Sequence, residues 1–202
     1  MLLRNNKLVE KSSHGTFRVP WLTLFFAGMV IGIYALGKNA FNIFVFDRSA
    51  IANGEFWRVF TGHIVHYNFD HLFWDVLAFI ILGAVVELND RRQLGPSFLI
   101  SSLGVSFWLY YYEPMIVTYC GLSGALNGLL VTASMILWNK TESRMYLFVM
   151  LSTIGKICYE FSTNQTVFVT MSSQPVPVSH LVGFISGLIC FFLLRKKFNV
   201  IE

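Results

Sequence analysis

Charged residues are scarce in this 202-residue sequence: Asp, Glu, Lys and Arg together make up 13% of it, against roughly 25% in soluble domains. So few charges exclude an intrinsically disordered chain and a protein that binds nucleic acid through a basic face. The three cysteines lack CxxC spacing, so neither a disulfide-rich module nor a zinc or redox pair is indicated. Hydrophobic residues make up 55% of the chain, and its mean hydropathy is +0.59. This composition is typical of a polytopic membrane protein.

Six hydrophobic runs approach the length of a membrane-spanning helix. They cover residues 20–36, 69–86, 96–111, 122–138, 145–159 and 178–194. Because these runs lack a polar face, an all-α membrane bundle of six transmembrane helices is favoured over a soluble helical bundle. We therefore predict a six-helix domain over residues 20–195, flanked by tails at 1–19 and 196–202. The first tail does not have the pattern of a secretory signal.

Lysine and arginine are distributed unevenly between the two ends of these predicted helices. If the N-terminus is cytoplasmic and every run crosses the membrane, 11 basic residues lie inside and 3 outside. The inside set is Arg4, Lys7, Lys11, Arg18, Arg91, Arg92, Lys140, Arg144, Arg195, Lys196 and Lys197, the outside set is Lys38, Arg48 and Arg58, and Lys156 lies within or near the end of the fifth run and is counted in neither. Basic residues favour the cytoplasmic side, so both tails are predicted to be cytoplasmic. The second, fourth and sixth helices then begin at the outer face.

Polar side chains gather near the outer ends of those three helices. They are His66, His71 and Asp75 at the second helix, Ser123 between Gly121 and Gly124 at the fourth, and Ser179 and His180 at the sixth. Polar groups inside a membrane are costly, so each of them is a candidate functional residue. The topology predicts that a hydroxyl, imidazoles and a carboxyl meet at one depth below the outer surface.

A serine and a histidine at the same depth permit nucleophilic catalysis. A serine hydroxyl is a weak nucleophile until a base removes its proton, and histidine is the usual base near neutral pH. Gly183 and Gly187 form a G-x-x-x-G pair, which lets two helices approach closely. This approach would bring His180 within reach of Ser123. Free backbone N–H groups at the start of the fourth helix can help to hold a developing oxyanion.

Four motifs follow one another along the chain. Glu55-Phe56-Trp57-Arg58 lies in the first outer loop, two histidines and an aspartate occupy positions 66, 71 and 75, G-x-S-G covers 121–124, and H-x-x-G-x-x-x-G covers 180–187. In this order and spacing they resemble the motifs of the rhomboid family of intramembrane serine proteases. The resemblance covers about residues 20–195.

The resemblance implies a catalytic dyad that needs no third acidic member, metal or cofactor. Ser123 would be the nucleophile and His180 the general base, and His71, Asp75 and Gly121 would line or support the oxyanion hole. The residues implied to have structural roles are Trp57, Arg58, His66, Gly124, Gly183 and Gly187. The implied substrates are membrane-anchored proteins, cut near the outer face in or beside a transmembrane segment, and the implied surroundings are the lipid bilayer.

Within the family, the chain looks closest to the small bacterial rhombosortase branch. This likeness depends on the segment 119–124 and on Lys156 and Glu160, which are spaced i,i+4; Asn127 stands where a histidine is expected. It implies an inner-membrane protein with its active site toward the periplasm. It also implies substrates that carry a C-terminal Gly-Gly motif, a membrane helix and a basic tail. Lys156 and Glu160 are either substrate contacts or a structural ion pair.

Asp75 departs from the family pattern, which has Asn at this position. An amide donates a hydrogen bond to an oxyanion, whereas an ionised carboxylate would repel it. Our hypothesis is that Asp75 is either held protonated by burial or paired with a neighbouring imidazolium such as His71. The alternative is that Asp75 has no catalytic part.

Two other functions stay open. A non-proteolytic rhomboid-like protein that binds membrane helices would typically lack the serine or the histidine, and both are present here. A metal or haem protein could use His63, His66, His71 and His180, but the spacing of five between two of them does not suit one helix face, and no H-E-x-x-H occurs. We expect no metal, cofactor or nucleic-acid partner, and the sequence indicates no oligomeric state.

Two smaller predictions concern the outer loop and the helix that follows it. His63 is predicted to be a surface residue of the loop. Asp70 is predicted to be the N-cap of the second helix, because it stands at the start of the hydrophobic run.

Overall fold

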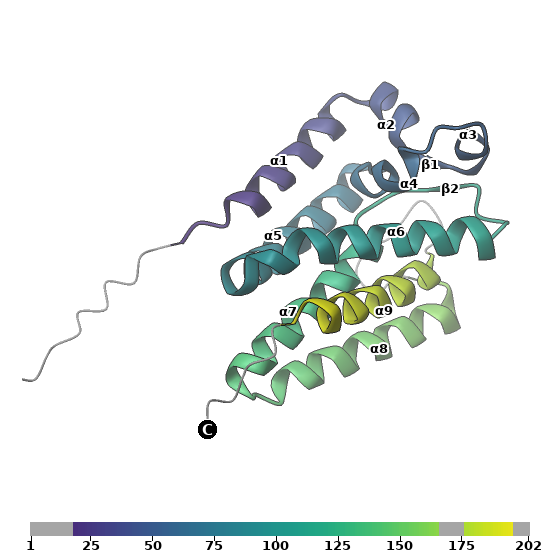
Figure 1. The fold of residues 1–202 in the computed structure, drawn as a ribbon. Coiled ribbons are helices and arrows are strands. Elements are labelled where there is room, and N and C mark those ends of the chain that lie inside the picture. Colours follow the sequence, from purple (N-terminus) through teal and green to yellow (C-terminus); the bar gives the residue numbers. More distant parts are fainter. Residues whose placement is uncertain (1–17, 166–175, 196–202) are drawn as a thin grey trace, which may run out of the picture.

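The computed structural model describes residues 18–165 and 176–195, and this part of the chain is mostly helical (Figure 1). Its elements in chain order are α1 (Trp21–Ala35), α2 (Lys38–Phe44), β1 (Phe46–Asp47), α3 (Arg48–Ala52), α4 (Arg58–Thr61), η1 (Gly62–Ile64), α5 (Phe69–Asp90), η2 (Arg91–Gln93), α6 (Leu94–Tyr112), β2 (Thr118–Tyr119), α7 (Ser123–Thr141), α8 (Met145–Thr163) and α9 (Pro177–Leu194). The long helices α1, α5, α6, α7, α8 and α9 coincide with the six predicted hydrophobic runs. Nearly all of the predicted tails at 1–19 and 196–202 lies outside the described residues.

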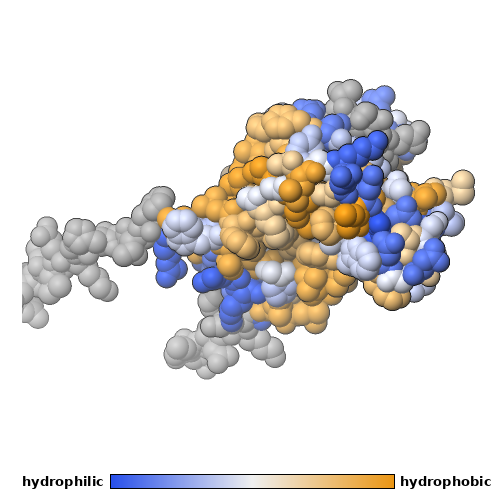
Figure 2. All heavy atoms as spheres, turned by 90° about the horizontal axis from the view of Figure 1, so that it is seen from above, coloured by the Kyte–Doolittle hydropathy of each residue, from blue (hydrophilic) through white to orange (hydrophobic). Residues whose placement is uncertain are grey.

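The outward faces of the long helices carry large hydrophobic side chains, such as Phe25, Ile81, Phe148 and Leu193. Figure 2 shows hydrophobic residues over the middle of the visible face and hydrophilic residues toward its ends. In lipid, a helix is a stable choice because its backbone N–H and C=O groups bond to one another. The hydrophobic runs therefore form helices whose outer surfaces suit a bilayer.

Two stretches among the described residues are long and hydrophobic enough by themselves to cross a membrane: residues Phe69–Tyr112 and Pro177–Leu194. The first has 44 residues, and it folds back at η2, so that α5 and α6 form a hairpin (Figure 1). Helices α1 and α2 could form a third span, but they are bent by 114° at their junction. The six-span topology therefore stays a prediction.

Helix α7 lies in the core and packs against α5, α6, α8 and α9. Its closest neighbour is α9, because glycines face each other across the contact. A Cβ atom on Gly183 would overlap the carbonyl of Gly124, and a Cβ atom on Gly187 would overlap the backbone of Gly128. The G-x-x-x-G spacing thus permits the close helix approach that the sequence predicted.

The connection between α1 and α5 folds into short elements that gather at one end of the long helices (Figure 1). Strand β1 pairs antiparallel with β2, with Phe46 opposite Tyr119 and Asp47 opposite Thr118. The prediction of an all-α fold missed this pair, because strands of two residues leave no periodic pattern in a sequence. The pairing ties the outer loop to the segment directly before α7.

Asn68, and not Asp70, is the N-cap of α5. The side-chain oxygen of Asn68 accepts a hydrogen bond from the backbone N–H of His71 at 2.8 Å. The prediction for Asp70 was wrong by two positions, because Phe69 is already the first helical residue and Asp70 is exposed in the first turn. The cap at Asn68 sets where α5 begins and so helps to orient His71.

Candidate active site

Ser123 is the first residue of α7 and is half-buried. The chain reaches it through Gly121, whose φ of +108° lies in a region that side-chain-bearing residues rarely adopt. A Cβ atom at Gly121 would also meet the imidazole ring of His71. The N–H of Gly121 donates to the carbonyl of Gly62 at 3.1 Å. The glycine therefore allows a sharp turn that places the serine at a helix N-terminus beside His71.

His180 lies in the first turn of α9 and is buried. Its Nε2 is 3.0 Å from the Oγ of Ser123. The close contact of α9 with α7 through Gly183 and Gly124 carries the histidine to the serine. The structure thus brings the two predicted residues to hydrogen-bonding distance, although they are 57 positions apart in the sequence.

A third group joins this pair from α8. The Oε2 of Glu160 is 2.7 Å from the Nδ1 of His180, and the Oε1 of Glu160 is 2.9 Å from the Nζ of Lys156. Glu160 is 0% exposed, whereas the Lys156 side chain is 27% exposed. Sequence reasoning found the i,i+4 pair but missed the contact with the histidine. The sequence did contain a signal for this contact. In the predicted topology, Glu160 near the end of the fifth run lies at the same depth as His180 at the start of the sixth.

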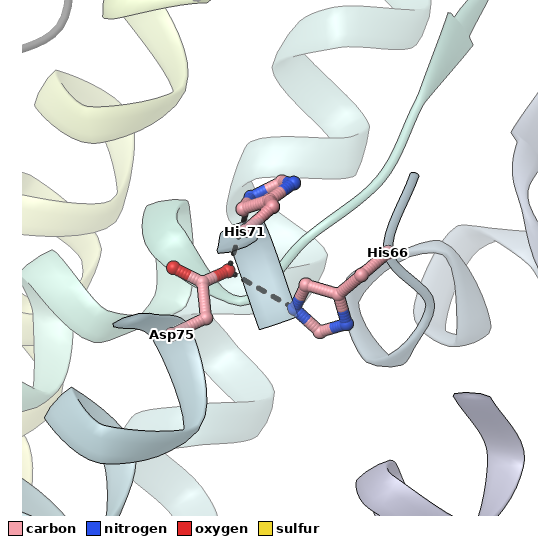
Figure 3. Close-up of side chains that lie close together, drawn as sticks. All are labelled: His66, His71 and Asp75. Carbon is pink, nitrogen blue, oxygen red and sulfur yellow. Dashed lines mark hydrogen bonds and ion pairs between the residues drawn. The ribbon is translucent and has the colours of Figure 1, made fainter. Parts of the chain in front are cut away.

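A second polar cluster lies beside the serine, at the start of α5 (Figure 3). One carboxylate oxygen of Asp75, Oδ2, is 3.1 Å from the Nε2 of His66 and 3.2 Å from the Nε2 of His71. The same oxygen accepts the backbone N–H of Leu122 at 2.7 Å. Oδ2 is therefore hydrogen-bonded to the Leu122 N–H and to the His66 ring and only contacts the His71 ring, an arrangement that suits an acceptor oxygen.

The argument that spacing separates His66 from His71 was wrong. His66 precedes α5 and is not on its helix, so the two rings approach each other at 4.9 Å between centroids. Together with Asp75 they offer ligand atoms that all lie within 4.8 Å of one another, a set that could hold a metal ion. In the structure these atoms contact one another, and the expectation of a metal-free protein stays a prediction.

Trp57 and Arg58 hold the outer loop together. The indole N–H of Trp57 donates to the carbonyl of Ile43 at 3.1 Å, and the guanidinium of Arg58 donates to the carbonyls of Asn42 and Val45, both at 2.8 Å. The guanidinium also pairs with Glu55 at 2.7 Å. These bonds satisfy backbone carbonyls that the short helices leave free.

The prediction that His63 lies at the surface was wrong. Its side chain is fully buried, and its Nε2 is 2.9 Å from the Oγ of Ser106 on α6. Burial lowers the pKa of His63 from its usual value to about 4. Loops usually lie at the surface, but this loop packs onto the helices, so its histidine is neutral and structural.

Two residues directly before the serine motif carry groups that could compete as nucleophiles. Burial raises the pKa of the Tyr119 hydroxyl and of the Cys120 thiol to about 12 each. A thiol reacts as its thiolate, so Cys120 is inert at neutral pH. Within this segment, the Oγ of Ser123 is the hydroxyl oxygen that lies at hydrogen-bonding distance from a histidine nitrogen.

Comparison with known proteins agrees with the geometry. Residues 53–197 match the model of the Rhomboid domain. This chain belongs to the rhomboid family. The chain is 29% identical over 159 residues to "Putative rhomboid protease YdcA" of Bacillus subtilis (strain 168), covering 73% of this chain and 71% of that protein. It is 26% identical over 170 residues to "Rhomboid-related protein 1" of Caenorhabditis elegans, covering 79% of this chain and 45% of that protein.

The family match confirms the resemblance found in the sequence, and it makes this rhomboid a membrane-embedded protein. The matched region contains both the serine and the histidine motifs. The likeness to the rhombosortase branch stays a prediction, since the comparisons bear on the family as a whole.

Proposed function

We propose that this rhomboid is an intramembrane serine endopeptidase. It cleaves membrane-anchored proteins in or beside a transmembrane segment, near the outer face of the membrane, through a Ser123–His180 dyad and an acyl-enzyme. The observation that carries the proposal is the distance of 3.0 Å between the Ser123 Oγ and the His180 Nε2. A nucleophile and a base within 2.6–3.2 Å are the signature of an activated serine.

The reaction follows from this geometry. Ser123 attacks the carbonyl carbon of the scissile peptide while its proton moves to the Nε2 of His180. The tetrahedral intermediate collapses, the C–N bond breaks, and His180 gives the proton to the leaving amine. Ser123 then carries the acyl group as an ester. Water deprotonated by His180 attacks the ester, which releases the new carboxyl terminus and restores the hydroxyl.

The oxyanion is held at the start of α7 in this proposal. N–H groups in the first turn of a helix have no partner within the helix, and the helix dipole favours negative charge there. Gly121 shapes this turn and His71 lies next to it. Asp75 supports the site indirectly, since its carboxylate accepts the Leu122 N–H. A carboxylate in that position orients the turn and does not itself donate to the oxyanion.

The proposed setting is the bacterial inner membrane, with six spans, both termini cytoplasmic and the site toward the periplasm. Transmembrane proteins are the substrates and lipid surrounds the enzyme. The segment 119–124, together with Lys156 and Glu160, supports a rhombosortase-like preference for anchors with a C-terminal Gly-Gly motif, a helix and a basic tail. Tagged anchors of this kind are the first substrates to test, against the same anchors with the Gly-Gly pair replaced by Val-Val.

A fluorescent fluorophosphonate tests the dyad without a known substrate. Wild type, Ser123→Ala and His180→Ala are purified in detergent and treated with the probe. We expect labelling of wild type, none of Ser123→Ala, and a loss of at least 100-fold in the labelling rate of His180→Ala, because general-base catalysis contributes about 10²–10⁴-fold. Cys158→Ser, which alters an exposed side chain of α8 and neither residue of the dyad, is the control and should label as wild type does.

Absence of labelling in folded wild type, both in detergent and in liposomes, would contradict the proposal. That result would favour a rhomboid-like protein that binds membrane helices without cutting them. The observation that favours this second function is Asp75, which stands where the family pattern has Asn. Crosslinking to a transmembrane segment without cleavage would support it.

A further inference from the structure

Glu160 is a fully buried carboxylate near the outer end of α8, and both of its oxygens have a partner. One oxygen is 2.7 Å from the Nδ1 of His180, and the other is 2.9 Å from the Nζ of Lys156. A buried charge is costly unless it is paired. Lys156 supplies a positive charge one helical turn away, which keeps Glu160 ionised. The carboxylate is therefore held in place and aimed at the histidine.

The contact with Glu160 decides which ring nitrogen of His180 carries the proton. A carboxylate only accepts hydrogen bonds, so the Nδ1 of His180 must be the donor. In a neutral imidazole the other nitrogen, Nε2, then presents its lone pair. That lone pair faces the Oγ of Ser123 at 3.0 Å. The histidine is thus fixed in the tautomer that can take the serine proton.

The same carboxylate stabilises the state in which His180 has taken that proton. The imidazolium is positive and Glu160 is negative, at a distance at which hydrogen bonds between charged groups are strong. Lys156 repels the imidazolium, but it contacts the far oxygen of Glu160, not the ring. The net effect of the chain Lys156–Glu160–His180 is to orient the base and to favour its protonated form during the reaction.

We propose that Glu160 is the third member of a Ser123–His180–Glu160 triad, acting as a positioning residue for His180, with Lys156 positioning Glu160 in turn. This inference rests on the proposed serine-protease function and replaces the simple dyad. The three groups come from α7, α9 and α8, so the triad needs all three helices to pack together. It also leaves Glu160 unable to contact substrate, because the carboxylate is buried behind the histidine.

Saturation kinetics with the fluorophosphonate separate a positioning role from a structural one. For Glu160→Gln we expect the maximal labelling rate to fall roughly 100- to 10,000-fold with the half-saturating probe concentration unchanged, as when the acid of a Ser-His-Asp triad is replaced by its amide. Glu160→Asp should recover part of the loss, and Lys156→Met should fall about 10-fold. Glu87→Gln is the matched control: that carboxylate bonds to Thr23 at 2.8 Å on another helix, so labelling should be unchanged.

Wild-type labelling by a folded Glu160→Gln would overturn the triad while leaving the proposed function intact. Failure of wild type itself to label would overturn the proposed function instead. NMR of wild type with ¹⁵N-labelled histidine gives a readout that needs no variant to fold. We expect the His180 proton on Nδ1, with a strongly downfield proton resonance. A proton on Nε2, with Nδ1 bare, would overturn the assignment whatever the activity.

Discussion

At the scale of single residues, the site has two anionic centres: Glu160 beside His180, and Asp75 beside the turn that precedes Ser123. Glu160 contacts His180, and Asp75 contacts His66, His71 and the backbone of Leu122. Each carboxylate is buried and contacts at least two nitrogen atoms of its neighbours. Buried polar groups of this kind specify one arrangement only when their partners are all present. The first centre therefore orients His180, and the second orients the turn before Ser123.

Replacing Asp75 tests the second centre. An amide oxygen in Asp75→Asn can still accept the Leu122 N–H, but it loses the charge that favours several donors. Hydrogen bonds to a charged group are worth about 1–2 kcal/mol more than neutral ones, so we expect the labelling rate at neutral pH to fall roughly 5- to 30-fold. Both proteins keep the carboxylate of Glu160 beside His180, so a steeper acid-side loss of activity in wild type than in the variant is the part that reports protonation of Asp75.

The measurement is the fluorophosphonate labelling rate of both proteins across the acid range. Asp75→Leu is the control, since it removes acceptor and charge together and should lose far more activity. Profiles that superimpose for wild type and Asp75→Asn would remove any role for the ionisation of Asp75.

The sequence predicted the residues of the site better than their partners. Ser123 and His180 stand in recognisable motifs, and the topology puts them at one depth. The contact between Glu160 and His180 depends on how α8 and α9 rotate against each other, which a hydrophobic run does not specify. His63 was misjudged for the opposite reason: its place in a loop suggested exposure, but the loop packs on α6.

At the scale of elements, close helix packing and a buried loop position the site. The glycines of α9 and α7 let His180 approach Ser123, and the pairing of β1 with β2 fixes the segment before the serine. Hydrophobic runs predicted the long helices well, because a helix in lipid must be hydrophobic over its whole length. The short elements of the outer loop could not be predicted from hydrophobic runs. They are held by hydrogen bonds from side chains to backbone carbonyls, such as the bond from the Arg58 guanidinium to the carbonyl of Val45.

The buried His63 makes the docking of η1 on α6 sensitive to acid. Its pKa is lowered to about 4 in the folded protein, whereas an unfolded chain has a histidine pKa of about 6.5. The unfolded state therefore binds a proton first as the pH falls. Above pH 6.5, His63 does not reduce the free energy of unfolding. As the pH falls from 6.5 to 4, the titration of His63 lowers that free energy, by about 3 kcal/mol at pH 4.

His63→Gln checks this prediction, because an amide can keep the bond to Ser106 without titrating. Unfolding midpoints in detergent should drop less for the variant than for wild type between pH 7 and pH 4.5. A residual drop is expected in both, since burial also lowers the pKa of His66. Equal drops in the two proteins would contradict the assignment of His63 as an acid-sensitive contact.

At the scale of the whole molecule, the basic residues separate to the two ends of the bundle. The start of α1, η2, the turn between α7 and α8, and the end of α9 lie at one end, and the short elements of the outer loop lie at the other (Figure 1). The described basic residues of the first end are Arg18, Arg91, Arg92, Lys140, Arg144 and Arg195, against Lys38, Arg48 and Arg58 at the second, and Lys156 lies in the second half of α8, nearer the second end. Charge counting alone could propose this separation, but only folding of the hairpins brings each set together.

This separation predicts the orientation in the membrane, because basic residues are retained on the cytoplasmic side. Asn53 is exposed between α3 and α4 at one end, and Thr141 is exposed at the end of α7 at the other. Asn53→Cys and Thr141→Cys are each introduced into the Cys158→Ser protein and expressed in cells that are converted to spheroplasts. A membrane-impermeant maleimide should label Asn53→Cys at once and Thr141→Cys only after permeabilisation. Cys120 and Cys190 are buried and should stay silent in the parent protein. The opposite order of labelling would invert the protein and put Ser123 on the cytoplasmic side, so that its substrates would be cut from within the cell.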